Sequence, residues 1–550
     1  TELTIGKFNE LSSYYVGYWR TRNDRFLKWY KLLILDKSDI EQEDMECVIS
    51  NDPKTFYKKA SRILSTGITH SVILDGVEKP ETVDTSGLIT FMENQWKKKD
   101  RLNMQRGKSR WIVEFVKLLL ATGWYDVLAY GLPGDGLIAE VRNPAECYPV
   151  FGEMGLVGHF HIWNMKMEDA IRKAQFFGWP LRTPQAKSVV VKDYWFIGDD
   201  SLVYNSIMVD NQLVKPATAM LQFLGIPILS GVAGGMPDEA SIWINDTEWP
   251  ARIGESIIAD NEDVYKNLNK QLSFTQQIIR DTAQYKVLEK SEVGTPIVDP
   301  NTFHKRGWIG RGGHDDSVDI LVAPPLPIEL SLHTKALGDQ VQRGGFPWSM
   351  YGGSQGAVTA YAMAQSSEAA KEILEPYAEV VTYVMSEIDN IWLQAMYNFR
   401  DVLIIDGISI PPTMPMVELK AEVPVNIPGD FIQRATLSRM ISPEFRLPQH
   451  FTMKMLWPEI KDIDKTIAAA RADEALNHPS AKLINLVSSY RQKANELREL
   501  GDNYGAELFD KASQMAEASL PLSLGITPES MPIAATQQSR AAPPPEEEML

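Results

Sequence analysis

The feature that most constrains this fold is a stretch of 39 residues, 255–293, that contains neither glycine nor proline. Apolar side chains recur along it at helical spacing, for example at Ile258, Tyr265 and Leu272. The pattern predicts one long amphipathic helix, because apolar residues three or four apart lie on one face of a helix. If the whole stretch were helical, it would span about 58 Å at 1.5 Å per residue.

The chain that follows is dense in glycine and proline and cannot continue this helix. Residues 294–327 therefore predict a separate, turn-rich module, in which 318–322 has the pattern of a strand. Residues 328–343 return to a helical pattern. They end in a glycine-rich, aromatic loop over 344–356.

A second long helix is predicted over residues 357–400, where apolar positions follow the 3.6-residue period. Pro376 lies inside this pattern, so a kink is expected near residues 372–376. Short strands are predicted beyond it, at 402–405 and 417–423. Further helical patterns cover 430–440, 448–456, 462–476, 482–500 and 503–520. The last 30 residues, from Pro521, hold six prolines, which predicts disorder.

The first 254 residues predict helices followed by a sheet. Helical patterns cover 8–35, 53–64 and 88–121. Between residues 123 and 205 the apolar period shortens toward two, and turn residues such as those at 131–136 separate the segments. Strands are predicted at 137–141, 147–151, 189–196 and 201–204. The sheet is expected to be antiparallel or mixed, and the fold class α+β, predominantly α.

Composition narrows the class of protein. The 550 residues are 44% hydrophobic, which is enough to bury a real core. Lys plus Arg number 55 and Asp plus Glu 72, giving a formal charge of −17. Such acidity argues against a tight binder of duplex DNA, since affinity for phosphates comes largely from Lys and Arg. Two cysteines exclude a disulfide scaffold and a four-thiolate zinc site. No apolar run approaches about 18 residues, so no membrane span is expected.

Motifs for catalysis are scarce. The sequence contains no phosphate-binding loop of the G-x-x-x-x-G-K-[ST] type, no H-E-x-x-H and no C-x-x-C. Gly352–Gly356 matches the G-x-S-x-G nucleophile motif around Ser354, but no buried strand precedes it, so a loop before a helix is the favoured interpretation. A serine hydrolase would need a downstream histidine, which only His450 and His478 could supply. We therefore expect a protein that is not an enzyme.

Three further clusters are interpreted as structural. His159 and His161 share one face of a strand, as metal ligands can, but no carboxylate or thiolate lies nearby at ligand spacing, so surface or half-buried histidines are expected. The His314–Asp316 triplet could hold a cation but is more typical of a solvated turn. The basic run 97–110 could meet nucleic acid, and is interpreted instead as the solvated face of a helix.

The order of these parts resembles the portal protein, or head-to-tail connector, of tailed bacteriophages. The resemblance covers residues 50–515 and is carried by the arrangement together with three short stretches, 118–130, 254–259 and 356–365. The last of these is similar to the portal segment that leads from the tunnel loop into the kinked helix.

The resemblance implies a division of the chain into eight parts. They are a wing (1–254), a stem helix (255–286), a clip (287–327), a returning stem helix (328–343), a tunnel loop (344–356), a kinked helix with returning wing strands (357–430), wing-to-crown helices (431–520) and a disordered tail (521–550).

The resemblance also implies a function. Portals form a ring, usually of twelve subunits, at one capsid vertex, through which DNA is packaged and ejected. The implied partners are further copies of the chain, the major capsid protein, the terminase large subunit and a head-completion or adaptor protein. Double-stranded DNA would pass through without tight binding, and no cofactor or metal is implied. The protein would be located in the virion, and in the host cytoplasm during assembly. Twelve chains at −17 each would carry −204, so an acidic wall around the duplex is plausible.

Site residues are implied in the same way. The channel and tunnel loop would present Lys335, Arg343, Phe346, Trp348, Met350, Tyr351 and Gln355. Pro376 would form the kink. The clip surface for the adaptor would include Arg306, Trp308, Arg311 and His314. Lys335 and Arg343 are the cations expected to touch phosphate transiently, unless they pair with carboxylates of the next subunit. The competing interpretations are another oligomeric virion protein and the hydrolase built on Ser354.

Overall fold

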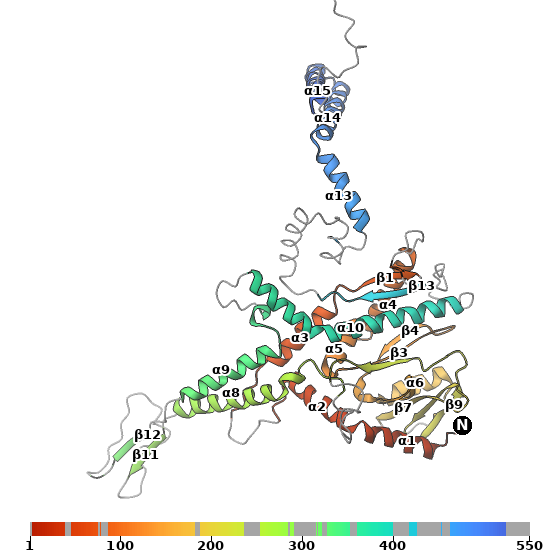
Figure 1. Cartoon of the computed structure of the whole chain (residues 1–550), viewed down its shortest axis with the longest axis vertical. Coiled ribbons are helices and arrows are strands. Elements are labelled where there is room, and N and C mark those ends of the chain that lie inside the picture. The colour runs from red at the N-terminus through yellow and green to blue at the C-terminus, as the bar shows by residue number, and fades with distance from the viewer. Residues whose placement is uncertain are drawn as a thin grey trace, which may run out of the picture. The chain divides into compact units, whose positions relative to one another are not determined.

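Two helices, α1 (Ile5–Tyr18) and α2 (Arg20–Ile34), begin the chain in the computed structural model (Figure 1). The sequence predicted one helix over 8–35, and the structure divides it at Trp19, which is not helical. The Trp19 indole is buried and donates a hydrogen bond to the carbonyl of Pro149 at 3.0 Å. This contact with a distant strand redirects the chain between the two helices.

The structure describes residues 3–38, 46–74, 77–78, 86–153, 155–181, 187–235, 253–283, 286–290, 315, 317–321, 327–351, 360–399, 417–425, 453 and 463–523. The chain divides into two units, Thr1–Gln433 and Arg434–Leu550.

Three helices surround the core of the first unit: α3 (Asp52–Leu64), α4 (Ser86–Gln105) and α5 (Trp111–Thr122). The predicted helix over 88–121 is thus two helices. Gly107 has a φ of 74° between them, and the Asp100 carboxylate accepts a hydrogen bond from the Trp111 backbone N–H at 2.8 Å. That bond satisfies one of the amides left without a partner at the start of α5.

The first sheet has the order β10-β3-β4, with β3 (Trp124–Leu132), β4 (Gly136–Val141) and β10 (Ile228–Val232), all antiparallel. The turn predicted at 131–136 is confirmed as the β3–β4 hairpin.

The second sheet is a five-stranded antiparallel meander, which answers the open question between antiparallel and mixed. Its strands pair in chain order: β5 (Cys147–Gly152), β6 (Gly155–Lys166), β7 (Ser188–Ile197), β8 (Val203–Val209) and β9 (Gln212–Ala219). Helix α6 (Met167–Phe177) connects β6 to β7. The predicted strand at 201–204 was placed too early, because residues 199–202 form the β7–β8 turn.

A third sheet joins distant parts of the sequence. Strand β1 (Thr69–Leu74) pairs antiparallel with β13 (Val417–Glu422) on one side and with β2 (Val77–Glu78) on the other. Helix α10 (Ala360–Asn398) packs on β13. Strand β13 and helix α10 therefore belong to the same folding unit as β1 and the N-terminal helices.

The stretch 255–293 is only partly helical, so the prediction of one continuous helix was wrong at both ends. Its first residues form an irregular connection ending in the turn η3 (Ala259–Asn261), and α8 covers Glu262–Ala283. Strand β11 (Lys286–Lys290) follows and pairs with β12 (Ser317–Leu321), the strand predicted at 318–322. Absence of glycine and proline permits a helix but does not require one where a partner strand is present.

Two glycines allow the connection before α8 to pack against the end of α5. Gly123 (φ 68°) and Gly254 (φ 75°) both adopt the left-handed region that favours glycine. A Cβ on Gly123 would lie 2.3 Å from the Glu255 nitrogen, and one on Gly254 would lie 2.7 Å from the Gly123 carbonyl oxygen. Larger residues would force these backbones apart.

The remaining elements of the first unit are α9 (Ile328–Arg343), whose bounds match the prediction, the turn η4 (Trp348–Tyr351) and α10. Buried tryptophans join three helices in its core: Trp96 of α4 lies 4.8 Å, centroid to centroid, from both Trp111 of α5 and Trp392 of α10. The Trp392 indole also donates to the Ile138 carbonyl at 2.9 Å, which fixes α10 against the first sheet.

The second unit contains α13 (Ile463–Asn477), α14 (Pro479–Glu499) and α15 (Asn503–Ser523), as predicted within a few residues. Gly501, with a φ of 84°, closes the α14–α15 hairpin, and Arg491 pairs with Glu517 across it at 2.6 Å. Helix α15 continues three residues into the tail that was expected to be disordered. The helix predicted at 430–440, the strand at 402–405 and the rest of the tail lie outside the described residues. Of the helix predicted at 448–456 only residue 453 is described, and it is helical. The fold class α+β, predominantly α, is confirmed.

Candidate functional site

Helices α8 and α9 form a pair within the first unit, and the β11–β12 strands lie between them along the chain (Figure 1). The base of the pair is fixed by hydrogen bonds. The Asn261 side-chain amide donates to the Val341 carbonyl at 3.0 Å, and the Trp29 indole of α2 donates to the Glu262 carboxylate at 2.9 Å. Gly344 permits the first contact, because a Cβ there would lie 2.6 Å from the Asn261 amide oxygen.

An extended segment, residues 46–50, runs along α8 and is bonded to it. The Ser273 hydroxyl accepts a hydrogen bond from the Val48 N–H at 3.0 Å, and Asn269 accepts one from the Ser50 N–H at 2.9 Å. Both α8 side chains are buried. The inner half of α8 is therefore held on one face by this segment and on another by α9.

The two cations predicted for the channel, Lys335 and Arg343, are both exposed on α9. Arg343 lies in the last turn of that helix, where a positive charge interacts favourably with the helix dipole. Their exposure keeps both available to a ligand or to another subunit.

The predicted tunnel loop divides into buried and exposed parts. Phe346 is fully buried and packs edge-on against Phe56 of α3, with ring centroids 4.7 Å apart. Its assignment to a channel surface was therefore wrong, because an aromatic ring following two glycines gains more from the core than from water. Trp348 is 49% exposed. The Lys59 ammonium of α3 donates to the Met350 carbonyl and lies 4.5 Å from the Tyr351 ring, which half-buries both residues.

Pro376 lies inside α10, as predicted, and Figure 1 shows the helix bending partway along its length. The next residue, Tyr377, is buried and donates a hydrogen bond to the Glu255 carbonyl at 2.7 Å. Glu255 also pairs with Arg25 of α2 at 3.2 Å. Helix α10 is thus tied, next to its proline, to the connection that leads into α8.

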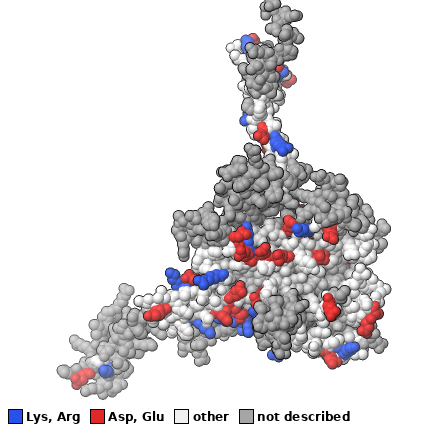
Figure 2. All heavy atoms as spheres, in the orientation of Figure 1, with Lys and Arg blue, Asp and Glu red and all other residues white. Residues whose placement is uncertain are grey.

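A row of four exposed carboxylates on α10 was missed by the sequence analysis. Glu368, Glu372, Glu375 and Glu379 are spaced by four, three and four residues, which places them on one helix face. We call them the α10 acidic stripe. Figure 2 shows acidic side chains across the part of the face where α10 runs in Figure 1. Glu368 pairs with Lys371 of the same helix at 3.4 Å. Like charges at the spacing of the stripe weaken a helix by about 0.2–0.5 kcal/mol per pair, so helix stability does not explain the other three.

Several predicted positions lie outside the described residues. They are Gln355 of the tunnel loop, the clip residues Arg306, Trp308, Arg311 and His314, and the possible nucleophile Ser354 with His450. Of the His314–Asp316 triplet only Asp315 is described, and it is exposed. His478 caps α14, since its ring nitrogen accepts a hydrogen bond from the Ser480 N–H at 3.3 Å.

The basic run 97–110 is solvated at most of its cationic positions, as expected, but not at Lys99. The Lys99 ammonium donates to the Leu137 carbonyl and lies 5.9 Å from the Trp392 ring centroid. Burial first, and then the charges of Lys98 and Arg106, lower the pKa of Lys99 to about 8. This lysine therefore joins α4 to the first sheet and α10 instead of offering a charge to solvent.

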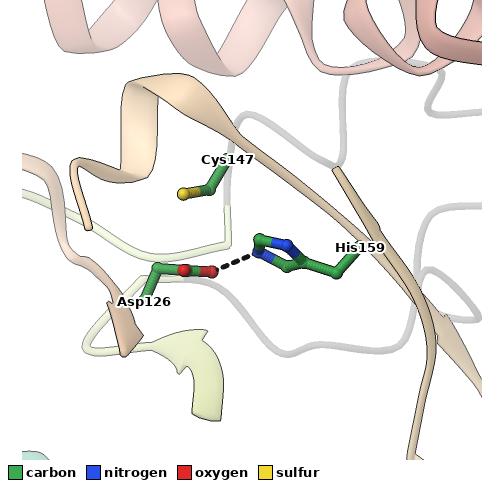
Figure 3. A group of neighbouring side chains, drawn as sticks. All are labelled: Asp126, Cys147 and His159. Atoms are coloured by element: carbon green, nitrogen blue, oxygen red, sulfur yellow. Dashed lines mark hydrogen bonds and ion pairs between the residues drawn. The ribbon is translucent and has the colours of Figure 1, made fainter. Parts of the chain in front are cut away.

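A buried cluster of three metal-ligand types is the second site. The sequence suggested only His159 and His161 as possible ligands, and it gave no carboxylate or thiolate to join them. Asp126 of β3, Cys147 of β5 and His159 of β6 are at most 2% exposed, and one ligand atom from each lies within 4.8 Å of the others. Figure 3 shows the three side chains converging. The His159 Nε2 and an Asp126 carboxylate oxygen are 2.5 Å apart. His161 is also buried, so the expectation of surface or half-buried histidines was wrong.

Strand register explains how the cluster forms. Cys147 lies opposite His161 and Pro149 opposite His159, so the cysteine and both histidines are on one face of the β5–β6 pair. The turn η1 (Pro144–Glu146), capped by the Asn143 side chain, places Cys147 at the start of β5. The two-residue alternation of the histidines and a cysteine at the far end of the same hairpin were the available signals. Asp126 belongs to the other sheet, so spacing along the sequence could not reveal it.

Two buried guanidinium groups lie near the cluster, each with its own partners. Arg142 pairs with Asp193 at 3.0 Å, and Arg22 donates to the Cys147 carbonyl at 2.6 Å while lying 4.4 Å from the Trp19 ring. Burial would raise the pKa of Asp126, but the charge and hydrogen bond of His159 and the charge of Arg142 outweigh it and lower that pKa. Burial, then the Asp126 charge, raise the pKa of the Cys147 thiol.

Comparisons with known proteins give only a distant likeness. No family model matches the sequence, and no curated protein matches it. Two similar solved structures are chains from the neck of a native GTA particle with C12 symmetry and from the neck of an empty GTA particle with C6 symmetry. The first is 13% identical with a TM-score of 0.41, and the second 12% identical with a TM-score of 0.43. In each comparison 74% of this chain and 90% of the other are covered. At these values the likeness assigns no function.

Among the described residues, no helix combines the length and apolar character that crossing a bilayer requires.

Proposed function

We propose that the protein is a portal-type subunit of a phage-like virion, which forms a ring at one capsid vertex and surrounds a channel for DNA. The observation that carries the proposal is the paired excursion of α8 and α9, clamped at its base by Asn261 and Val341, with two strands at its far end. A long antiparallel helix pair of this kind is an element that a ring can use to line a shared axis.

The acidic charge of the chain supports the proposal of a channel through which DNA slides. Each Lys or Arg that pairs with a phosphate adds affinity, and so slows movement of the duplex. The chain carries −17, and the α10 acidic stripe presents four carboxylates on one exposed face. Exposed Lys335 and Arg343 would make the few transient phosphate contacts.

The remaining parts of the proposal follow from the ring. Copies of the chain, usually twelve, would meet the major capsid protein around the outside. The terminase large subunit and a head-completion or adaptor protein would bind the ring at different stages of assembly. We infer that the protein is not an enzyme, and that the motor that moves DNA is a separate protein.

Electron microscopy of the purified full-length chain tests the proposal. We expect closed rings with a central opening of at least about 20 Å, wide enough for a duplex. Rings without an opening, or open filaments, would favour another oligomeric virion protein, and a monomer at all concentrations would overturn the proposal.

The phosphate contact has its own test. Arg343→Ala should change the rate of DNA packaging in a salt-dependent way while rings still form. If the packaging rate were unchanged at every salt concentration, Arg343 would make no phosphate contact, and the proposal of a ring would be unaffected.

A further inference from the structure

The cluster of Asp126, Cys147 and His159 offers a set of ligands that zinc prefers. A thiolate, an imidazole nitrogen and a carboxylate oxygen are the three protein ligand types of zinc sites. Here each comes from a different strand, and the three ligand atoms already lie within 4.8 Å of one another without any change of fold.

Two polar atoms in the cluster point to a ligand. Among the described residues, the buried atoms Asp126 Oδ1 and His159 Nδ1 make no hydrogen bond of regular geometry, and the Cys147 thiol is the hydrogen-bonding neighbour of the Asp126 carboxylate. An unpartnered buried polar atom costs about 1–3 kcal/mol, so a buried polar group is expected to gain a partner where one is available. The carboxylate oxygen can gain one by binding a metal.

We propose that Asp126, Cys147 and His159 bind a zinc ion that fastens the first sheet to the second. The ion would bridge β3 of the β10-β3-β4 sheet to β5 and β6 of the five-stranded meander. When the sulfur–zinc bond forms, the thiol proton leaves to solvent, so thiolate and carboxylate together carry two negative charges against the dication. A water molecule would complete a tetrahedral site.

Zinc binding requires His159 and Asp126 to move apart. His159 Nε2 and Asp126 Oδ2 are 2.5 Å apart, as a direct hydrogen bond. Two ligands bound tetrahedrally at about 2.0–2.1 Å from one zinc lie about 3.3 Å apart. The carboxylate must therefore move by less than about 1 Å, which rotation of the Asp126 side chain allows.

The nearby guanidinium groups do not block the ion. Arg142 is paired with Asp193, and Arg22 lies over the Trp19 and Trp124 rings while donating to two backbone carbonyls. Each therefore has acceptors of its own, although among the described residues Arg142 Nε, Arg142 Nη1 and Arg22 Nη1 are buried without a hydrogen-bond partner. Since the three ligands are at most 2% exposed, zinc must enter as the unit folds.

The test measures zinc in the full-length protein and uses the second cysteine and second histidine as matched controls. Protein refolded with zinc and dialysed against a weak chelator should retain about one ion per chain. Cys147→Ser should weaken zinc binding by at least about 100-fold, whereas Cys47→Ser and His161→Gln should retain it.

Cobalt gives a spectroscopic readout of the site in the wild-type chain. Refolding the wild-type chain with Co²⁺ should produce a sulfur-to-cobalt charge-transfer absorption, which Cys147→Ser should abolish and Cys47→Ser should keep. The proposal is overturned if the wild-type chain binds less than about a tenth of an ion after refolding, or if Cys47→Ser loses zinc as Cys147→Ser does. Neither measurement depends on whether rings form.

Discussion

Tyr377 fastens the bent helix α10 to the connection that enters α8, because its hydroxyl donates to the Glu255 carbonyl at 2.7 Å. This bond lies one residue after Pro376, where α10 has lost a backbone donor. Burial raises the pKa of Tyr377, so the hydroxyl remains a donor throughout the neutral range. The bend of α10 and the base of the α8–α9 pair are thus held at a single point.

Tyr377→Phe should lower the free energy of unfolding by about 0.5–1.5 kcal/mol, the usual net contribution of one hydrogen bond. Urea unfolding of the full-length chain measures it. Tyr383→Phe, at a half-exposed position of the same helix, is the control and should change stability by less than about 0.5 kcal/mol. Equal effects of the two substitutions would show that the bond does not hold α10.

Phe346→Ala should cost about 3–5 kcal/mol of stability, because it empties a buried site against Phe56. Trp348→Ala, two residues later and half-exposed, should change stability by less than about 0.5 kcal/mol. Thermal or urea unfolding distinguishes them. The opposite ranking would return Phe346 to the surface role that the sequence suggested.

Gly123→Ala should destabilise the chain by more than about 2 kcal/mol. The new Cβ would meet Glu255 backbone atoms, and a left-handed conformation costs a non-glycine residue roughly 1–2 kcal/mol. Gly107 has a similar φ of 74° with no atom within 4 Å of its Cβ position, so Gly107→Ala isolates the conformational cost. If both variants lost the same stability, the close approach would contribute nothing.

Lys99 should make stability rise with pH. Its folded pKa, about 8, lies below its ordinary value of 10.5, so between these two pH values the unfolded chain binds more protons than the folded one. Lys99→Met should flatten that rise, by an amount on the order of 1–3 kcal/mol between pH 7.5 and 10.5. Denaturant unfolding at several pH values compares the two proteins. If the stability of both proteins changed with pH in the same way, the Lys99 ammonium would be solvated in the folded chain.

Reversing the α10 acidic stripe should make purified rings retain DNA. Glu372→Lys with Glu375→Lys should increase affinity for duplex DNA, and the slope of log K against log salt should steepen by roughly 0.9 for each phosphate neutralised. A matched pair of substitutions, Glu10→Lys with Glu168→Lys, changes the net charge equally at exposed positions outside the stripe. If both double variants retained DNA equally, the net charge, and not the position of the stripe, would determine how strongly DNA is retained.

The sequence predicted correctly those helices and strands whose ends are set by residues within or directly next to them. Helix α9 matches at both ends because Pro327 and Gly344 flank it. Strand β11 was missed because its partner, β12, lies about 30 residues away along the chain. Trp19 ends α1 through a carbonyl 130 residues distant. Competition from tertiary partners decides such segments, and a single sequence does not display them.

The site was predictable to a similar degree. The channel role of Lys335 and Arg343 stays a prediction, and the structure shows both exposed on α9. Pro376 lies inside α10, as its position in the helical pattern predicted. Phe346 and Lys99 were misassigned because burial depends on which elements cover a residue. The Asp126–Cys147–His159 cluster needed the packing of two sheets, which no spacing rule supplies.

Strand β1 is synthesised long before β13, the strand with which it pairs. About 340 residues separate the two strands, so at translation speeds of about 5–20 residues per second β1 waits roughly 20–70 s for its partner. Throughout that interval one edge of β1 is open to any other extended chain. Nascent copies of the chain that lie close together could therefore pair through β1 before their own β13 is made.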